Sequence, residues 1–138
     1  MQTQAAAATP VIHKLLDGIA AEFSLSPDRI LLAGFSQGGM MTILGGLTYS
    51  RPLAGLVSIA GAVLAPDEIA EAPDAASDIF MIHGDADPVV PFQALDIGLQ
   101  LLQDKGYRTE RLACAGVGHG ISPDALTALI GFADRQFG

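Results

Sequence analysis

Residues 29–39 read Arg29-Ile30-Leu31-Leu32-Ala33-Gly34-Phe35-Ser36-Gln37-Gly38-Gly39, an apolar run that ends at a serine flanked by glycines. The run up to Phe35 shows no alternation of polar and apolar residues, which predicts a strand covered on both faces in a parallel sheet. From Gln37 to about Tyr49, apolar residues recur at helical spacing. The sequence therefore predicts a strand that turns sharply into a helix, with Ser36 on the turn.

The rest of the chain alternates between helix-like and strand-like segments. Helical spacing predicts further helices at about 9–23, with Pro10 in its first turn, at 91–105 and at 122–136, and a short helix within 66–73. Apolar runs predict buried strands at 53–60 and 78–83, and mixed polarity predicts an edge strand at 107–114. This order predicts one α/β domain over residues 1–138, with about four mainly parallel strands and helices on both faces.

Composition argues against several classes of partner. The 138 residues include 15 acidic and 7 basic side chains, and the formal charge of −8 repels nucleic acids and anionic membranes alike. The longest apolar run, residues 53–65, is too short to cross a bilayer, and the first residues lack the pattern of a secretory signal. One cysteine, Cys114, cannot form an intrachain disulfide. We expect a soluble, cytoplasmic protein with no nucleic-acid partner and no stable membrane insertion.

The pattern Gly34-Phe35-Ser36-Gln37-Gly38 at a strand-to-helix junction is typical of a nucleophile elbow, G-x-S-x-G. The serine must occupy a strained turn, and flanking glycines let the neighbouring backbone pass close to it. The helix that follows directs its first N–H groups at the substrate oxygen that becomes negative in the tetrahedral intermediate. The N–H of Gln37 is therefore the candidate oxyanion donor. The alternative is a glycine-rich turn of purely structural origin.

A serine hydroxyl needs a histidine base, and three histidines are available. His13 lies on what should be the wet side of the first helix, which favours a solvated side chain. His83 ends a buried strand, and we expect it to be hydrogen-bonded within its own loop. His119 stands between Gly118 and Gly120 in a loop just before a helix, which makes it the candidate base.

Two carboxylates, Asp85 and Asp87, follow the same predicted strand, and either could orient the base. Asp87 is favoured because Pro88 restricts its backbone to extended geometry, whereas Asp85 is suited to bonding loop amides or His83. A metal cluster formed by His83, Asp85 and Asp87 is the competing interpretation, but no second group of ligands supports it. The sequence also lacks a dinucleotide fingerprint and a P-loop lysine, so we expect neither a metal nor an organic cofactor.

The chain order serine, acid, histidine, each beyond a different predicted strand, is satisfied by Ser36, Asp87 and His119. At these positions the sequence resembles the phospholipase/carboxylesterase family of α/β-hydrolases, which includes acyl-protein thioesterases. The similar stretches are residues 29–40, 83–91 and 118–121. The resemblance implies that Ser36 is the nucleophile, Asp87 the orienting acid and His119 the general base. It also implies short-chain or lipid-like carboxylic esters and thioesters as substrates, with no metal or organic cofactor.

The same resemblance implies a longer protein, because the family's N-terminal third would hold the early strands and the loop with the second oxyanion donor. Without that part, the backbone from Ile30 to Ala33 would form an unpaired apolar edge. We expect a second copy of the chain or the missing segment to cover this edge. Two functional classes remain: a serine esterase, and a catalytically weak or silent assembly module that lacks a complete oxyanion hole.

Overall fold

The computed structural model describes the backbone of residues 2–138 and the side chains from residue 7 onward. Its four strands form one sheet in the order β1-β2-β3-β4, and every neighbouring pair is parallel. The strands are β1 (Leu31–Phe35), β2 (Gly55–Ile59), β3 (Ile79–Gly84) and β4 (Thr109–Cys114). The α-helices are α1 (Gln2–Glu22), α2 (Gln37–Thr48), α3 (Gln93–Asp104) and α4 (Pro123–Phe137), with short 3₁₀ helices at Pro27–Arg29 and Pro66–Glu68. The predicted α/β class is confirmed.

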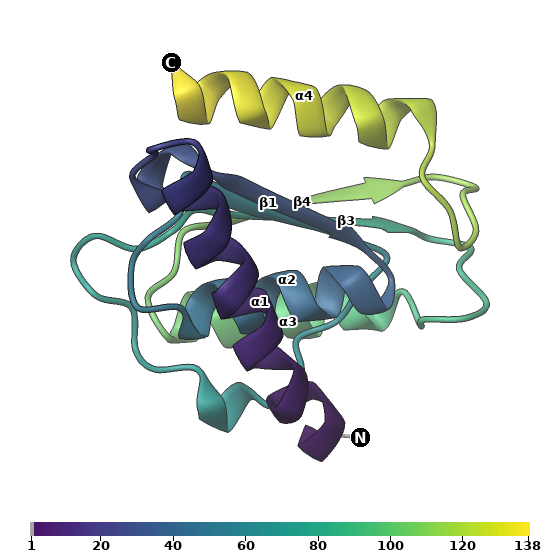
Figure 1. Cartoon of the computed structure of the whole chain (residues 1–138). Coiled ribbons are helices and arrows are strands. Elements are labelled where there is room, and N and C mark those ends of the chain that lie inside the picture. Colours follow the sequence, from purple (N-terminus) through teal and green to yellow (C-terminus); the bar gives the residue numbers. More distant parts are fainter. Residues whose placement is uncertain (1) are drawn as a thin grey trace.

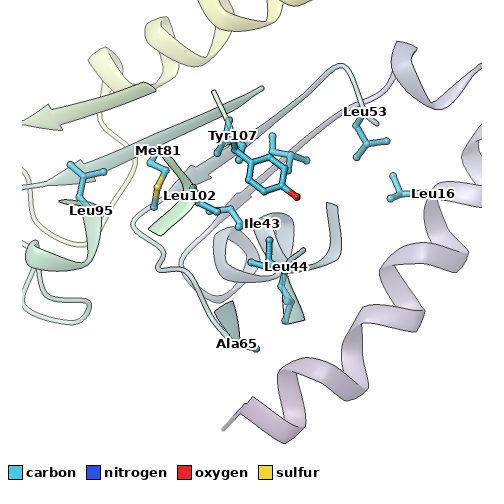
Figure 2. Close-up of a cluster of buried hydrophobic side chains, with 12 residues drawn as sticks. Leu16, Ile43, Leu44, Leu53, Ala65, Met81, Leu95, Leu102 and Tyr107 are labelled. Atoms are coloured by element: carbon cyan, nitrogen blue, oxygen red, sulfur yellow. The ribbon is translucent and has the colours of Figure 1, made fainter. Parts of the chain in front are cut away.

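Helices cover both faces of the sheet, as predicted. In Figure 1, α4 lies over one face, and α1, α2 and α3 lie over the other. The larger core cluster fills the space on the three-helix side, and Figure 2 shows its members Leu16, Ile43, Leu44, Leu53, Ala65, Met81, Leu95, Leu102 and Tyr107. On the other face, Phe132 of α4 is fully buried, and the centroid of its ring lies 5.5 Å from that of Phe80 in β3. The two central strands, β2 and β3, therefore have apolar cover on both sides, as buried parallel strands require.

Strand β1 lies at one edge of the sheet, where it pairs only with β2. Its residues are half-buried and Ala33 is exposed, whereas every residue of β2 and β3 is buried. The expectation that residues 29–35 are covered on both faces is therefore wrong for β1. The reason is its position, because an edge strand has neighbours on one side only.

Helix α1 begins earlier than the sequence predicted. It starts at Gln2 rather than near residue 9, so Pro10 lies inside the helix and not in its first turn. The alanine run before Pro10 has the highest intrinsic helix propensity, which accounts for the extension. Proline lacks an N–H, so the helix gives up one backbone hydrogen bond at this point.

Helix α4 begins as its sequence predicted. The Ser122 hydroxyl accepts a hydrogen bond from the N–H of Ala125 (3.2 Å), and Pro123 occupies the first helical position. The predicted helix within residues 66–73 is confined to Pro66–Glu68. Within residues 2–138, none of the helices has the length and apolar character needed to cross a bilayer.

Candidate active site

Ser36 lies on the turn between β1 and α2, at the carboxyl end of the sheet. Its backbone is at φ 57° and ψ −119°, a conformation that costs a non-glycine residue on the order of 1–3 kcal/mol. Two backbone hydrogen bonds hold the turn. The N–H of Ser36 donates to the carbonyl of Ile59 (2.8 Å), and the N–H of Met40 donates to the carbonyl of Ser36 (3.0 Å). The strained turn is therefore held by β2 on one side and by α2 on the other.

Two glycines allow the close backbone approach at this turn. A Cβ atom on Gly34 would collide with the carbonyl oxygen of Gly38, and one on Gly39 would stand 2.6 Å from the hydroxyl oxygen of Ser58. A Cβ atom on Gly38 would have no neighbour within 4 Å. The predicted steric need for glycine therefore holds at Gly34 and is wrong at Gly38, and the structure adds the same need at Gly39.

The carboxylate of Asp87 is held by the loop that follows β3. Its Oδ1 accepts hydrogen bonds from the N–H groups of Val89 (2.8 Å) and Val90 (2.9 Å), and its side chain is fully buried. This arrangement leaves Oδ2 directed at His119, whose Nδ1 lies 2.8 Å away. The loop thus fixes the orientation of the acid with main-chain donors.

His119 connects the acid to the serine. Its Nδ1 lies 2.8 Å from Oδ2 of Asp87, and its Nε2 lies 2.9 Å from Oγ of Ser36. A carboxylate only accepts hydrogen bonds, so Nδ1 carries the proton, and Nε2 of the neutral ring accepts from the serine hydroxyl. The structure therefore brings together the three side chains that the sequence nominated, from three loops far apart in the chain.

The ring of Phe35, at the end of β1, packs against the imidazole of His119. The two ring centroids are 4.9 Å apart, and the planes are tilted by 45°. Sequence reasoning did not identify this contact. Its one available signal is an aromatic residue immediately before Ser36, which by itself indicates only a buried strand end.

The environment of Asp87 favours its charged form. Burial alone raises the pKa of the carboxyl group, but the hydrogen bonds from His119, Val90 and Val89, together with the charge of His119, outweigh burial and lower the pKa below its ordinary value. The acid is therefore ionised over the neutral pH range. An ionised carboxylate is what keeps the Nδ1 proton on the far side of the ring from Ser36.

Gln37, the predicted oxyanion donor, comes directly after Ser36 in the structure. Gln37 is the first residue of α2, and the first N–H groups of a helix have no acceptor within the helix. The positive end of the helix dipole lies at the same place. The geometry suits the backbone of Gln37 to a negative oxygen that develops beside Ser36.

The other two histidines have different surroundings. His13 is half-buried, with Nε2 3.0 Å from both the carbonyl of Gly45 and the hydroxyl of Thr48, so the expectation of a solvated side chain is wrong. Helix α1 packs against α2 on the side that carries His13, which the local sequence does not reveal. His83 is buried, with Nε2 2.9 Å from the carbonyl of Val90 in the loop that follows its strand, as predicted.

Asp85 does not share the site of Asp87. Its Oδ1 accepts a hydrogen bond from the N–H of Gly116 (2.8 Å), a role in bonding loop amides that the sequence suggested. Of the residues that the structure describes, no three histidine, cysteine or acidic side chains are grouped so as to hold a metal ion. His83, Asp85 and Asp87 therefore do not form the metal cluster considered as an alternative.

Comparison with known proteins identifies similar sequences and folds. A family model described as phospholipase/carboxylesterase matches residues 1–136. The chain is 32% identical over 115 residues to acyl-protein thioesterase 1 of Gibberella zeae, a match that covers 80% of this chain and 49% of the relative. It is 35% identical over 121 residues to a probable carboxylesterase of Oryza sativa subsp. japonica, covering 86% of this chain and 45% of the relative.

The crystal structure of SOBER1 of Arabidopsis thaliana is similar to the whole chain. The TM-score is 0.91 at 27% identity, and the match covers 100% of this chain and 67% of that chain. The chain spans about half the length of the curated relatives it matches.

Proposed function

This chain belongs to the phospholipase/carboxylesterase family, and on that basis we propose that it carries the machinery of a serine hydrolase that cleaves carboxylic esters or thioesters through an acyl-enzyme. The observation that carries the proposal is the continuous hydrogen-bonded chain from Asp87 through His119 to Ser36, with contacts of 2.8 and 2.9 Å. The names of the relatives, thioesterase and carboxylesterase, support the reaction class.

The proposed reaction begins at Ser36. Its Oγ attacks the carbonyl carbon of the substrate while its proton passes to Nε2 of His119, and the carbonyl oxygen becomes negative. Asp87 stabilises the imidazolium that forms. When the tetrahedral intermediate collapses, His119 gives that proton to the leaving alcohol or thiol, and the acyl group remains on Ser36. Water, activated by His119, then releases the carboxylic acid and restores the serine.

The N–H of Gln37 would stabilise the oxyanion of both tetrahedral intermediates. Loss of one such donor costs on the order of a hundred- to a thousandfold in turnover in a known serine hydrolase. The level of activity therefore depends on whether a second donor accompanies Gln37. This is the physical basis of the second candidate function, an assembly module that keeps the triad positions with little or no turnover.

Two assays with the same protein separate these candidates. With p-nitrophenyl acetate, an acyl-enzyme predicts a burst of p-nitrophenolate that approaches one equivalent per chain, and Ser36→Ala abolishes it. A fluorophosphonate probe labels the serine without requiring turnover of an ester. Labelling with a burst supports the hydrolase, and labelling without a burst supports the silent module. If the folded chain is neither labelled nor acylated, the proposed function is wrong.

We further propose a cytoplasmic location and a partner for the exposed edge of β1. The location is supported by Cys114, which is free and buried. The partner is supported by the edge itself, since an apolar edge strand is a template for pairing with another strand. A second copy of the chain, or a segment that precedes it in a longer protein, would supply that strand.

A further inference from the structure

His83 is a buried titratable residue that the proposed reaction does not use. It lies near the end of β3, opposite Ala113 of β4, and its side chain is 2% exposed. The ring of Phe92 packs edge-on against it, with the centroids 6.0 Å apart. Burial of a polar ring is costly unless its nitrogens are satisfied, so the contacts of His83 indicate why it is there.

The Nε2 atom of His83 faces two acceptors in the loop that holds Asp87. It lies 2.9 Å from the carbonyl oxygen of Val90 and 3.3 Å from Oδ2 of Asp87. Neither a carbonyl nor a carboxylate can donate, so Nε2 carries the proton. That proton is donated to Val90, and the carboxylate of Asp87 lies beside the same N–H.

Besides the direct approach of His83 to Asp87, Val90 links the two side chains through its backbone. Its carbonyl accepts from His83, while its own N–H donates to Oδ1 of Asp87 (2.9 Å). The imidazole thus holds the carbonyl of the same residue whose N–H binds Oδ1, and its Nε2 also lies 3.3 Å from Oδ2. Among the polar groups around this carboxylate, His83 is the one that belongs to the central sheet, whereas Val89, Val90 and His119 belong to loops.

We propose that His83 is a positioning residue for the hydrolysis: by holding Val90 and bordering Oδ2, it keeps the Asp87 carboxylate in the orientation that His119 requires. This inference rests on the proposed function, and His83 itself touches neither substrate nor Ser36. Without the N–H donor, the loop keeps its main-chain bonds to Oδ1, but the peptide group between Val90 and Pro91 loses the partner that holds it and can rotate. The carboxylate then loses its fixed angle to Nδ1 of His119.

The test compares His83→Phe with His83→Gln in the whole chain, using p-nitrophenyl acetate. Phenylalanine keeps a ring beside Phe92 but has no donor, whereas the glutamine amide can still donate to Val90. We expect His83→Phe to lower kcat by about 10- to 100-fold, the range found when a partner that orients a metal-ligating residue is removed, with KM within about twofold. His83→Gln should recover most of that loss. If His83→Phe fails to fold, His83→Asn replaces it, since its amide is too short to reach Val90.

Two controls separate positioning from packing. Phe92→Leu disturbs the packing of the His83 ring without removing a donor, so it should lower Tm while kcat stays within about threefold. In an Asp87→Asn background, adding His83→Phe should lower kcat by less than about a further threefold, because the carboxylate that His83 positions is already lost. The inference is overturned if His83→Phe keeps full kcat, or if Phe92→Leu lowers kcat as much as His83→Phe does. It is also overturned if the kcat losses of His83→Phe and Asp87→Asn multiply in the double variant.

A readout without turnover keeps this test independent of the proposed function. The Nδ1 proton of His119, bonded to Asp87, should give a strongly deshielded proton resonance in the wild-type chain. His83→Phe should shift or broaden this resonance while Phe92→Leu leaves it in place. If the chain is inactive and not labelled by a fluorophosphonate but still shows this difference, the proposed hydrolase function is wrong and the positioning role of His83 stands. If His83→Phe leaves the resonance unchanged, the positioning role of His83 is wrong.

Discussion

Asp87→Asn is the substitution with the most specific expected consequence. The new amide oxygen can still accept from the N–H groups of Val89 and Val90, which hold Oδ1 at 2.8 and 2.9 Å, so the loop should keep its shape. The amide nitrogen, however, would face Nδ1 of His119, which lies 2.8 Å from Oδ2. Two donors cannot share that contact, so the imidazole must move its proton from Nδ1 to Nε2.

The tautomer change removes the base from the reaction. Nε2, 2.9 Å from Oγ of Ser36, would carry a proton and could no longer accept the one from the serine. In a serine protease with the same arrangement, the corresponding change lowers kcat by about 10⁴, which is about 5.4 kcal/mol of transition-state stabilisation at 1.36 kcal/mol per decade. We expect a loss of the same order in kcat, with little change in KM because Asp87 is buried and does not touch the substrate.

The assay is steady-state hydrolysis of p-nitrophenyl acetate together with thermal unfolding. Asp85→Asn is the matched control: it neutralises a carboxylate two residues away, and its amide oxygen can still accept from Gly116. We expect Asp85→Asn to keep kcat within about threefold. A kcat for Asp87→Asn within tenfold of wild type, in a folded protein, would refute the assignment of the orienting acid.

Four further predictions follow from particular contacts. The folded-state pKa of Asp87 lies below its ordinary value of 3.8, so the ionised carboxylate stabilises the fold above pH 3.8, and this stabilisation is lost as the pH falls through the folded-state pKa. Acid unfolding of Asp87→Asn should therefore depend less on pH in this range than that of the wild type. Gly34→Ala should destabilise the fold by about 1–3 kcal/mol in urea unfolding through collision with the carbonyl of Gly38, whereas Gly38→Ala should cost less than about 0.5 kcal/mol. The buried hydroxyl of Ser58 has no hydrogen-bond partner within residues 2–138, so Ser58→Ala should raise stability by about 1 kcal/mol, and a lower Tm would contradict this. If two chains pair through β1, light scattering at micromolar concentration should give a dimer that Ala33→Lys dissociates, and a wild-type monomer would exclude self-pairing.

Much of the candidate site could be predicted from the sequence because its signals are local. A serine between glycines at a strand-to-helix junction, and an acid and a histidine each just beyond a later strand, need only the rule that parallel strands end at the same edge of the sheet. Pro88 beside Asp87 was enough to favour that acid over Asp85. In each case the relevant information lies within a few residues of the functional side chain.

The features that sequence reasoning missed depend on packing between distant segments. His13 was assigned to solvent because its neighbours in α1 are polar, but its partners Gly45 and Thr48 belong to α2. The apolar run at residues 29–35 suggested a strand covered on both faces, and only the family resemblance indicated the edge position that explains the half-exposed state of β1. For His83, a hydrogen bond within its own loop was predicted and is confirmed by Val90, but its approach to Asp87 depends on the path of that loop, which residue spacing does not determine.

The central claim is that His119 activates Ser36, and peptide mapping by mass spectrometry after reaction with a fluorophosphonate tests it most directly. The account predicts one adduct per chain, on the peptide that contains Ser36, formed at a rate that falls by at least 10²-fold in His119→Ala. An adduct on another residue, or an unchanged labelling rate without the imidazole, would contradict it.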